Sequence, residues 1–222
     1  IALKNTFIIL IGITITILPL SFIVALLLEK PFRGSGVVQS MIFAPNVIAP
    51  ILVGLIWLFI LDPKMGMINA ILRSIGLSDY QQQWIGGKTL TPYSVAFVYL
   101  WQVLGFYTTI NMAGLRSIPA DIYEAAEIDG AGRFRKMYHI TFAGILPTAT
   151  VLFIMQLGKV MSVGYEKIIL MSNDLVLAKS EIISSYVYKL GFGTYPDYGY
   201  STAVNLFNMV VNLIILCTAN CI

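Results

Sequence analysis

The chain has 222 residues, of which 58% are hydrophobic and 11% are charged, and its mean hydropathy is +0.82. Soluble domains carry about 25% charged residues, so this composition excludes a soluble globular protein and predicts an integral membrane protein. The net charge of +3 is too small and too dispersed to indicate a nucleic-acid partner. Cys217 and Cys221 lie four residues apart in the last apolar segment, which suits packing better than a disulfide or a metal site.

Five stretches are long and apolar enough to cross a bilayer, which takes about 20 mostly apolar residues. They cover approximately residues 5–28, 38–61, 92–115, 144–164 and 199–222. The second contains Pro45, Asn46 and Pro50, and the backbone groups that these prolines free can be accommodated only against other protein or in a wet cavity. The sequence therefore predicts an all-α fold, a polytopic transmembrane helical bundle with five spans in this segment.

Two longer polar loops separate some of these spans, at residues 62–91 and 165–198. In the first, residues 86–89 look like the end of a phosphate-binding loop, but Gln82 stands where such a loop needs its first glycine. Any ATP chemistry therefore belongs to another polypeptide. In the second loop, residues 180–190 begin with a serine at an N-cap position and predict a short helix in the outer interface.

The only sizeable charged block lies at residues 117–147, between the third and fourth spans. Pro119 is tolerated in the first turn of a helix, and Asp121 precedes Glu124 at the spacing of a capping box. Both features predict a short helix that begins just after Ser117.

Glycines at positions 130 and 132 predict the end of that helix. A second short helix is predicted beyond them, with an apolar stripe of Phe134, Met137 and Ile140. On the first helix Ala125 and Ala126 are small and lie between acidic neighbours, so a partner's surface could approach closely and then meet charge. The alternative is a pair of amphipathic helices that rest on the membrane interface.

A family resemblance is carried by Glu124-Ala125-Ala126, by Asp129-Gly130-Ala131, and by Ile140 with Leu146-Pro147. At this spacing these residues resemble the EAA motif in the membrane subunits of ATP-binding-cassette (ABC) importers, in particular the sugar permeases related to those of the maltose transporter. The chain departs from the family at Phe142-Ala143, where a proline is usual.

The resemblance implies a type I ABC importer permease, in which residues 1–222 form a single transmembrane permease domain. It also implies a further membrane helix before Ile1, hence six spans in the full chain, and a short cytoplasmic tail after Ile222. Residues 117–147 would form a cytoplasmic coupling loop that sits in a cleft of the ATPase subunit and carries its closing motion to the pore. The residues expected to couple to the ATPase are Glu124, Ala125, Ala126, Asp129 and Gly130.

The same resemblance implies the partners. A second permease subunit, two ATPase subunits at the cytoplasmic face and an extracytoplasmic solute-binding protein would complete the importer, in the lipid of a bacterial cytoplasmic membrane that this chain crosses several times. ATP and Mg would be bound by the partner ATPase, so no cofactor, catalytic residue or metal site is expected in this chain.

The distribution of basic residues gives modest support to this orientation. The turn after the first span and the coupling loop together carry as many Lys and Arg residues as the two longer loops, in a little over half the length, which favours the cytoplasmic side for the first set. The first set is Lys30, Arg33, Arg116, Arg133, Arg135 and Lys136, and the second is Lys64, Arg73, Lys88, Lys167, Lys179 and Lys189.

Polar side chains within the spans are candidates for a substrate pathway, because such groups are costly in a membrane without a function or a partner. On the fourth span Gln156, Lys159 and Ser162 follow one another at single-turn spacing and define a polar stripe. The resemblance implies that this face lines the sugar pathway, together with Phe106, Tyr107 and Thr108 of the third span. For Lys159 the alternative is snorkelling, in which its ammonium reaches the outer interface.

An ion-gradient-driven secondary transporter is the main alternative function. That class usually carries carboxylates at membrane depth, whereas Glu29, Asp62 and Glu166 all lie at or beyond the ends of the predicted spans. An intramembrane enzyme would need a convergent nucleophile, base or metal set, and the spans contain none.

The substrate is predicted only by resemblance. Residues 164–167, 181–188 and 198–203 resemble the branch of sugar permeases that handles oligosaccharides from complex polysaccharides, including those that contain uronic acids. Maltodextrins and glycerol phosphate are the alternatives at this stage. The predicted function is a permease for oligosaccharides that couples closure of the partner ATPase to substrate passage.

Overall fold

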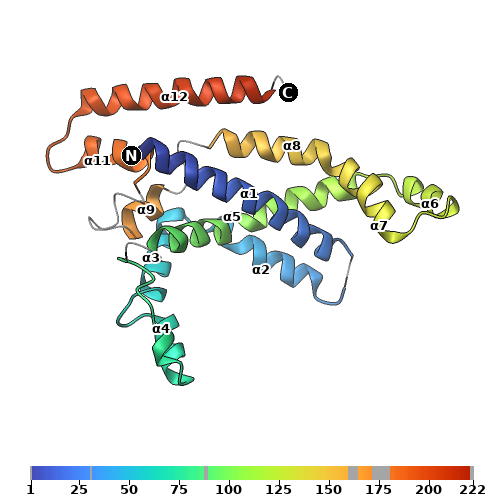
Figure 1. Ribbon diagram of the computed structural model, residues 1–222, viewed down its shortest axis with the longest axis horizontal. Coiled ribbons are helices and arrows are strands. Elements are labelled where there is room, and N and C mark those ends of the chain that lie inside the picture. The colour runs from blue at the N-terminus through green and yellow to red at the C-terminus, as the bar shows by residue number, and fades with distance from the viewer. Residues whose placement is uncertain (1, 31, 88–89, 160–164, 172–180, 221–222) are drawn as a thin grey trace. The chain divides into compact units, whose positions relative to one another are not determined.

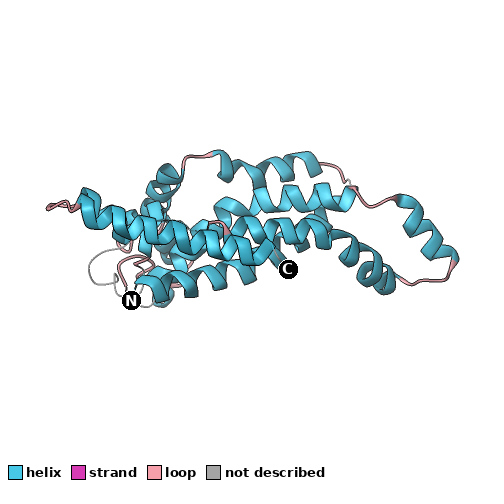
Figure 2. Ribbon diagram, turned by 90° about the horizontal axis from the view of Figure 1, so that it is seen from above, coloured by secondary structure: helices cyan, strands magenta, loops and turns pink. Residues whose placement is uncertain are grey.

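The computed structural model describes residues 2–30, 32–87, 90–159, 165–171 and 181–220, and within these residues it contains helices and no strand (Figure 2). The all-α prediction is confirmed. In chain order the elements are α1 (Ala2–Glu29), α2 (Ser35–Val47), α3 (Pro50–Ile60), α4 (Met67–Ser74), η1 (Ser78–Tyr80), α5 (Thr91–Arg116), α6 (Ala120–Ile128), α7 (Arg133–Lys136), η2 (Met137–Phe142), α8 (Ala143–Leu157), α9 (Tyr165–Met171), α11 (Ile183–Phe192) and α12 (Tyr198–Asn220) (Figure 1).

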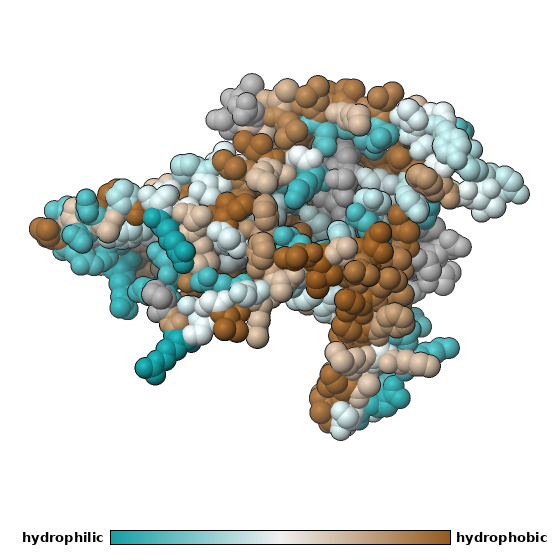
Figure 3. All heavy atoms as spheres, turned by 180° about the vertical axis from the view of Figure 1, so that it is seen from behind, coloured by the Kyte–Doolittle hydropathy of each residue, from teal (hydrophilic) through white to brown (hydrophobic). Residues whose placement is uncertain are grey.

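Four helical segments are long and apolar enough to cross a membrane: α1, α5, the continuous run Arg133–Leu157, and Tyr198–Ala219 of α12. The pair α2 and α3 qualifies as a fifth only if the two are counted as one bent span. This agrees with the five predicted spans. Apolar side chains make up much of the exposed surface of the isolated chain (Figure 3), as expected for helices that meet lipid or partner subunits.

The second span is not the continuous helix that residues 38–61 predict, because the helix breaks between α2 and α3, at residues 48–49. Pro50 is the first residue of α3, and Ala49 before it has φ −53° and ψ 133°. A proline disfavours helical backbone in the residue that precedes it, so the helix stops and restarts there. Pro45, by contrast, lies inside α2 and is buried.

The predicted start of the fourth span, at residue 144, agrees with the start of α8 at Ala143, but the helical backbone begins earlier. Helical backbone runs without interruption from Arg133 through α7, the π-helical segment η2 and α8 to Leu157. Gly144 is a packing position within that run, because a Cβ there would lie 2.7 Å from Cδ1 of Ile118. The predicted end of the span, residues 160–164, lies outside the described residues.

The chain divides into two compact units. The first contains residues 1–13, 48–102 and 157–222. Its core joins α3, α5, α9 and the residue before α11, and α3 packs closely on α9 because Gly54 lies against the side chain of Leu170. The buried apolar residues of this core are Val53, Leu61, Val95, Val98, Ile168, Met171 and Ile182.

Within this unit, α11 is anchored on the first turns of α1. The hydroxyl of Thr6 accepts a hydrogen bond from the backbone N–H of Ile183 at 3.1 Å, and Asn5 donates to the carbonyl of Glu181 at 3.2 Å. The N-cap residue of α11 is Ile182, and its backbone N–H donates a hydrogen bond to the hydroxyl of Ser185. The predicted N-cap serine is therefore wrong, and position 180 lies outside the described residues.

The loop after α3 is more ordered than its polar composition indicates, because it contains α4. Buried Asn69 organises it. Its amide donates to the carbonyls of Pro63 and Gln82 and accepts from the indole N–H of Trp84, each at 2.9–3.0 Å. Helix α4 has only eight residues, so its hydrophobic periodicity is too short to predict it from the sequence.

The second unit contains residues 14–47 and 103–156. Helices α1, α2, α5 and α8 contribute to it, and its buried apolar core is Ala25, Leu28, Met112, Leu115 and Ile145. The amide of Asn111 donates to the hydroxyl of Ser21 at 2.9 Å, which satisfies both groups in the interior. Whether residues 1–222 act as one transmembrane domain stays a prediction.

Candidate functional site

The charged stretch at 117–147 folds into α6, a turn, and the helical run that becomes the fourth span. Helix α6 begins at Ala120 with Pro119 as its N-cap residue. The predicted capping box does not form, because a proline in the N-cap position offers no side-chain oxygen and no side-chain bond caps this end. Asp121 instead lies in the first turn, where its carboxylate stabilises the positive end of the helix dipole.

The C-terminus of α6 is closed by a Schellman motif. The N–H of Gly130 donates to the carbonyl of Glu127 at 3.0 Å, and the N–H of Ala131 donates to the carbonyl of Ala126 at 2.8 Å. This pattern requires a left-handed residue at the turn, and Gly130 has φ +77°. The sequence correctly predicts that Gly130 ends the helix.

The second predicted helix is not separate, since α7 continues through η2 into α8. Gly132 is its N-cap residue, with φ −66° and ψ 167°. The segment η2 is π-helical, and single π turns inside α-helices are frequent at functional sites.

Two side-chain contacts hold α6 against this helical run. The hydroxyls of Tyr123 and Thr141 lie 3.0 Å apart and share a hydrogen bond, and Thr141 is buried. Beside the turn, the ammonium of Lys136 donates to the carboxylate of Glu127. The hydrogen bond and the positive charge of Lys136 lower the pKa of Glu127. We call these two contacts the coupling clamp.

Most of the predicted coupling residues are exposed. Glu124, Ala125, Asp129 and Gly130 are exposed, and Ala126 is half-buried. A hollow of about 550 Å³ lies on the inner side of the turn, and its lining residues are Ala126, Asp129, Ala131, Arg135, Lys136, His139 and Ile140. Large apolar side chains flank the turn, since Ile128 is 87% exposed and Phe134 is 88% exposed. Such side chains would bury apolar area if a partner covered the turn.

The structure brings two of the predicted pathway residues together. Tyr107 and Gln156 are both fully buried, and the Tyr107 hydroxyl donates to the Gln156 side-chain carbonyl. The ring of Phe106 meets that of Tyr107 edge to face, with 5.7 Å between the centroids. The Nε2 group of Gln156 has no hydrogen-bond partner.

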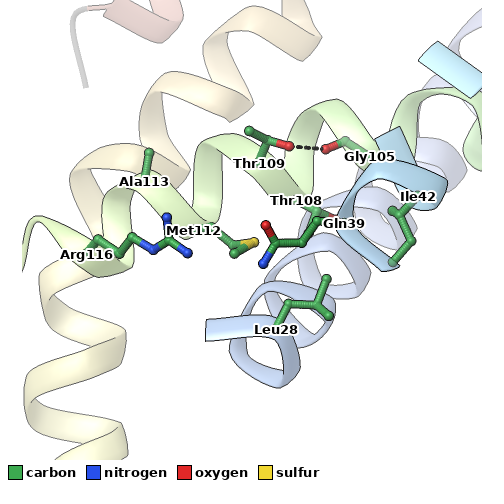
Figure 4. Close-up of a pocket in the computed structure, with 9 residues that line it drawn as sticks. All are labelled: Leu28, Gln39, Ile42, Gly105, Thr108, Thr109, Met112, Ala113 and Arg116. Atoms are coloured by element: carbon green, nitrogen blue, oxygen red, sulfur yellow. Dashed lines mark hydrogen bonds between the residues drawn. The ribbon is translucent and has the colours of Figure 1, made fainter. Parts of the chain in front are cut away.

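The other pathway predictions lie elsewhere. Thr108 is buried and lines a separate cavity of the second unit, between α1, α2 and α5 (Figure 4). Lys159 is exposed in the turn after α8, and Ser162 lies outside the described residues.

The sequence does not reveal that Lys167 is buried. This side chain, in the short helix α9, is 2% exposed and lies with its ammonium 5.5 Å from the centroid of the Tyr99 ring. Burial lowers the pKa of the Lys167 ammonium, and the nearby charge of Glu166 opposes that shift. The sequence gives no sign that Lys167 is buried, because its composition predicts a polar, solvent-exposed loop at this position.

The chain matches a known family over almost its whole length. The family described as "Binding-protein-dependent transport system inner membrane component" matches residues 7–219. Protein LplB of Bacillus subtilis (strain 168) is 33% identical over 204 residues, which are 91% of this chain and 63% of LplB, so the chain spans less than two thirds of that relative.

Three further comparisons concern transport of polysaccharides. YteP of Bacillus subtilis (strain 168), a polygalacturonan/rhamnogalacturonan transport system permease protein, is 31% identical over 221 residues, covering 98% of this chain and 68% of YteP. The crystal structure of a bacterial ABC transporter involved in the import of the acidic polysaccharide alginate matches with a TM-score of 0.90 and 29% identity, over 99% of this chain and 76% of that chain. A structure of the bacterial alginate ABC transporter in complex with an alginate pentasaccharide-bound periplasmic protein matches with a TM-score of 0.89 and 30% identity, over the same shares of the two chains.

Proposed function

Since this chain belongs to the family of binding-protein-dependent transport system inner membrane components, we propose that it is the membrane-spanning permease subunit of an ABC importer for oligosaccharides. In this proposal residues 117–147 form the cytoplasmic coupling loop. ATP and Mg are bound by a partner ATPase, so this chain is a transport subunit and not an enzyme.

The observation that carries the proposal is the geometry of α6. A helix whose exposed face offers Glu124 and Ala125 ends in a Schellman turn at Gly130, and exposed Ile128 lies beside that turn. Small residues allow close approach, the carboxylate can complement a positive charge on the partner, and burial of the apolar side chain on docking is favourable. These are the properties that a cleft of an ATPase subunit would engage.

The coupling clamp gives this surface a mechanical role. Through the pair Tyr123 and Thr141, a displacement of α6 is applied directly to the helical run that contains the fourth span. The ion pair between Glu127 and Lys136 holds the other end of α6 beside the turn. With both contacts in place, α6 and the start of the fourth span move together, and ATPase closure is passed on to the spans.

For the substrate we propose an oligosaccharide, including those that contain uronic acids. The named substrates of the similar proteins, polygalacturonan/rhamnogalacturonan and alginate, support this class. Within the second unit, its passage would be lined by Phe106, Tyr107 and Gln156, which the structure brings together. Lys159 stays a separate prediction. The buried pair Tyr107 and Gln156 supports the assignment, because Gln156 retains an unpaired N–H group that a sugar hydroxyl could accept from.

The complete importer would also contain a second permease, two ATPase subunits and an extracytoplasmic solute-binding protein, in a bacterial cytoplasmic membrane. A periplasmic protein bound to the alginate transporter supports the last of these partners. An ion-coupled transporter is disfavoured, because among the described residues no Asp or Glu is buried.

Site-directed cross-linking tests the docking surface. In a background in which both native cysteines are replaced by serine, Ala125→Cys in α6 is expected to cross-link to the partner ATPase. Asp79→Cys, exposed in η1 of the predicted outer loop, is the matched control and is expected to give no such product. Cross-linking from Asp79→Cys, or from neither position, would overturn the proposed docking.

A further inference from the structure

A cavity of about 160 Å³ lies within the second unit, between the end of α1, the first half of α2 and the C-terminal half of α5. Helices α2 and α5 approach closely at its inner end, because a Cβ on Gly105 would lie 2.2 Å from the carbonyl oxygen of Ile42. The lining residues are Leu28, Gln39, Ile42, Gly105, Thr108, Thr109, Met112, Ala113 and Arg116 (Figure 4).

This cavity is distinct from the pair formed by Tyr107 and Gln156. Successive residues on a helix point about 100° apart, so Tyr107 and Thr108 face different neighbours. Tyr107 bonds Gln156 of α8, whereas Thr108 lines the cavity beside α2.

Three polar side chains of the lining have unused hydrogen-bonding capacity. The hydroxyl oxygen of Thr108 is buried without a partner. Within the described part of the chain, neither the amide of Gln39 nor the guanidinium of Arg116 takes part in a side-chain hydrogen bond or an ion pair. In Figure 4 the ends of the Arg116 and Gln39 side chains point toward one another on either side of Met112. By contrast, the hydroxyl of Thr109 already donates to the carbonyl of Gly105 at 2.9 Å.

The positions of these groups select the chemistry of the ligand. Arg116 is exposed in the last turn of α5, where a guanidinium recognises a carboxylate or a phosphate. Thr108 lies eight residues earlier, about 12 Å deeper along the helix, and is 2% exposed. A lipid could place its phosphate at Arg116, but its acyl chain would leave the Thr108 hydroxyl unpaired at a cost. A ligand with an anionic group at one end and hydroxyls at the other satisfies both.

We propose that this cavity is an inner subsite for an acidic sugar, in which Arg116 binds a uronate carboxylate while Gln39 and Thr108 bind sugar hydroxyls. The proposal rests on the proposed function as an oligosaccharide permease and narrows its substrate to anionic sugars. In the predicted orientation Arg116 is at the cytoplasmic end of α5, so the subsite holds the sugar late in its passage.

Uptake by proteoliposomes that contain the complete importer tests the subsite. The probes are tetragalacturonate and its methyl ester, which has the same length without the charge. Arg116→Gln is expected to lower kcat/KM for the acid about tenfold or more, as for the loss of a charge-assisted hydrogen bond, and to lower that for the ester much less. Thr108→Val is expected to lower both. The controls are Arg33→Gln, an exposed arginine outside the cavity, and Thr150→Val, whose hydroxyl bonds its own helix at 2.9 Å.

A binding measurement does not depend on transport. In the cysteine-free background, Thr108→Cys should be labelled by a small membrane-permeant thiol reagent, and tetragalacturonate should slow that labelling severalfold. Protection by phosphatidylglycerol in place of the sugar would assign the cavity to a lipid and overturn the inference. So would equal losses for acid and ester in Arg116→Gln. If the parent complex imports neither sugar nor any other oligosaccharide, the proposed function itself fails, which is a different result.

Discussion

Replacement of Gly130 by alanine should destabilise the turn after α6, and the only cause should be the backbone conformation at this position. Gly130 has φ +77°, and a Cβ added there would have no heavy atom within 4 Å, so no steric clash contributes. Left-handed backbone costs an L-residue about 1–2 kcal/mol, which lowers the population of the turn by a factor of roughly 5 to 30. Asparagine tolerates this conformation better, so Gly130→Asn should lose less than Gly130→Ala.

Gly132 is the matched control. Its Cβ position is equally open, and its φ of −66° and ψ of 167° suit any residue. Because Gly132 is an N-cap residue and serine is favoured there, Gly132→Ser should not weaken the loop. The assay is ATP hydrolysis by the reconstituted importer with and without substrate-loaded binding protein, after extraction and size-exclusion chromatography have shown normal insertion and assembly. Stimulation should fall in the order parent, Gly130→Asn, Gly130→Ala. Full stimulation in Gly130→Ala would refute the role given to this turn.

Three further predictions concern the coupling clamp and the proposed pathway. Tyr123→Phe removes one hydrogen bond, worth about 0.5–1.5 kcal/mol, and should reduce stimulated ATP hydrolysis about two- to tenfold. The control is Tyr138→Phe, at an exposed tyrosine in η2, which should have no effect. Equal behaviour of the two variants would show that Tyr123 is not part of the clamp. Because Lys136 lowers the pKa of Glu127, the ion pair should stabilise α6 at neutral pH and lose this contribution as the pH falls below the usual glutamate value of 4.5 and through the lower folded-state value. Hydrogen-exchange protection of α6 measures this loss, and Glu127→Gln should not show it. Lys159→Met should leave expression and ATPase docking intact and reduce uptake of an acidic oligosaccharide far more than of a neutral one; equal loss, or none, would favour snorkelling of Lys159.

The sequence predicts most of the elements that local patterns encode. Apolar length predicts the spans, and Gly130 predicts the end of α6 because a single residue type serves that backbone conformation. What it does not predict depends on contacts between distant residues. The hydrogen bond between Tyr123 and Thr141 joins positions 18 apart across a turn, and no periodicity marks such a pair.

The same distinction explains the errors in the spans. The two prolines at 45 and 50 look alike in sequence, but the helix continues through Pro45 and breaks before Pro50. Gly144 looks like a helix boundary in sequence, whereas in the structure it makes room for Ile118. The cavity beside Arg116 could not be predicted either, since its lining joins α1 and α2 to α5, which lies far from them in the chain.

The central claim, that this chain is an importer permease coupled to a partner ATPase through α6, is tested most directly by uptake of labelled oligosaccharide into proteoliposomes. The complex of this chain with its second permease and ATPase should import the sugar only with ATP inside and substrate-loaded binding protein outside. Glu124→Lys, which reverses a charge on the docking face, should abolish that uptake while assembly of the two permeases persists. Uptake that continues without ATP and follows an ion gradient, or that is unchanged in Glu124→Lys, would contradict the account.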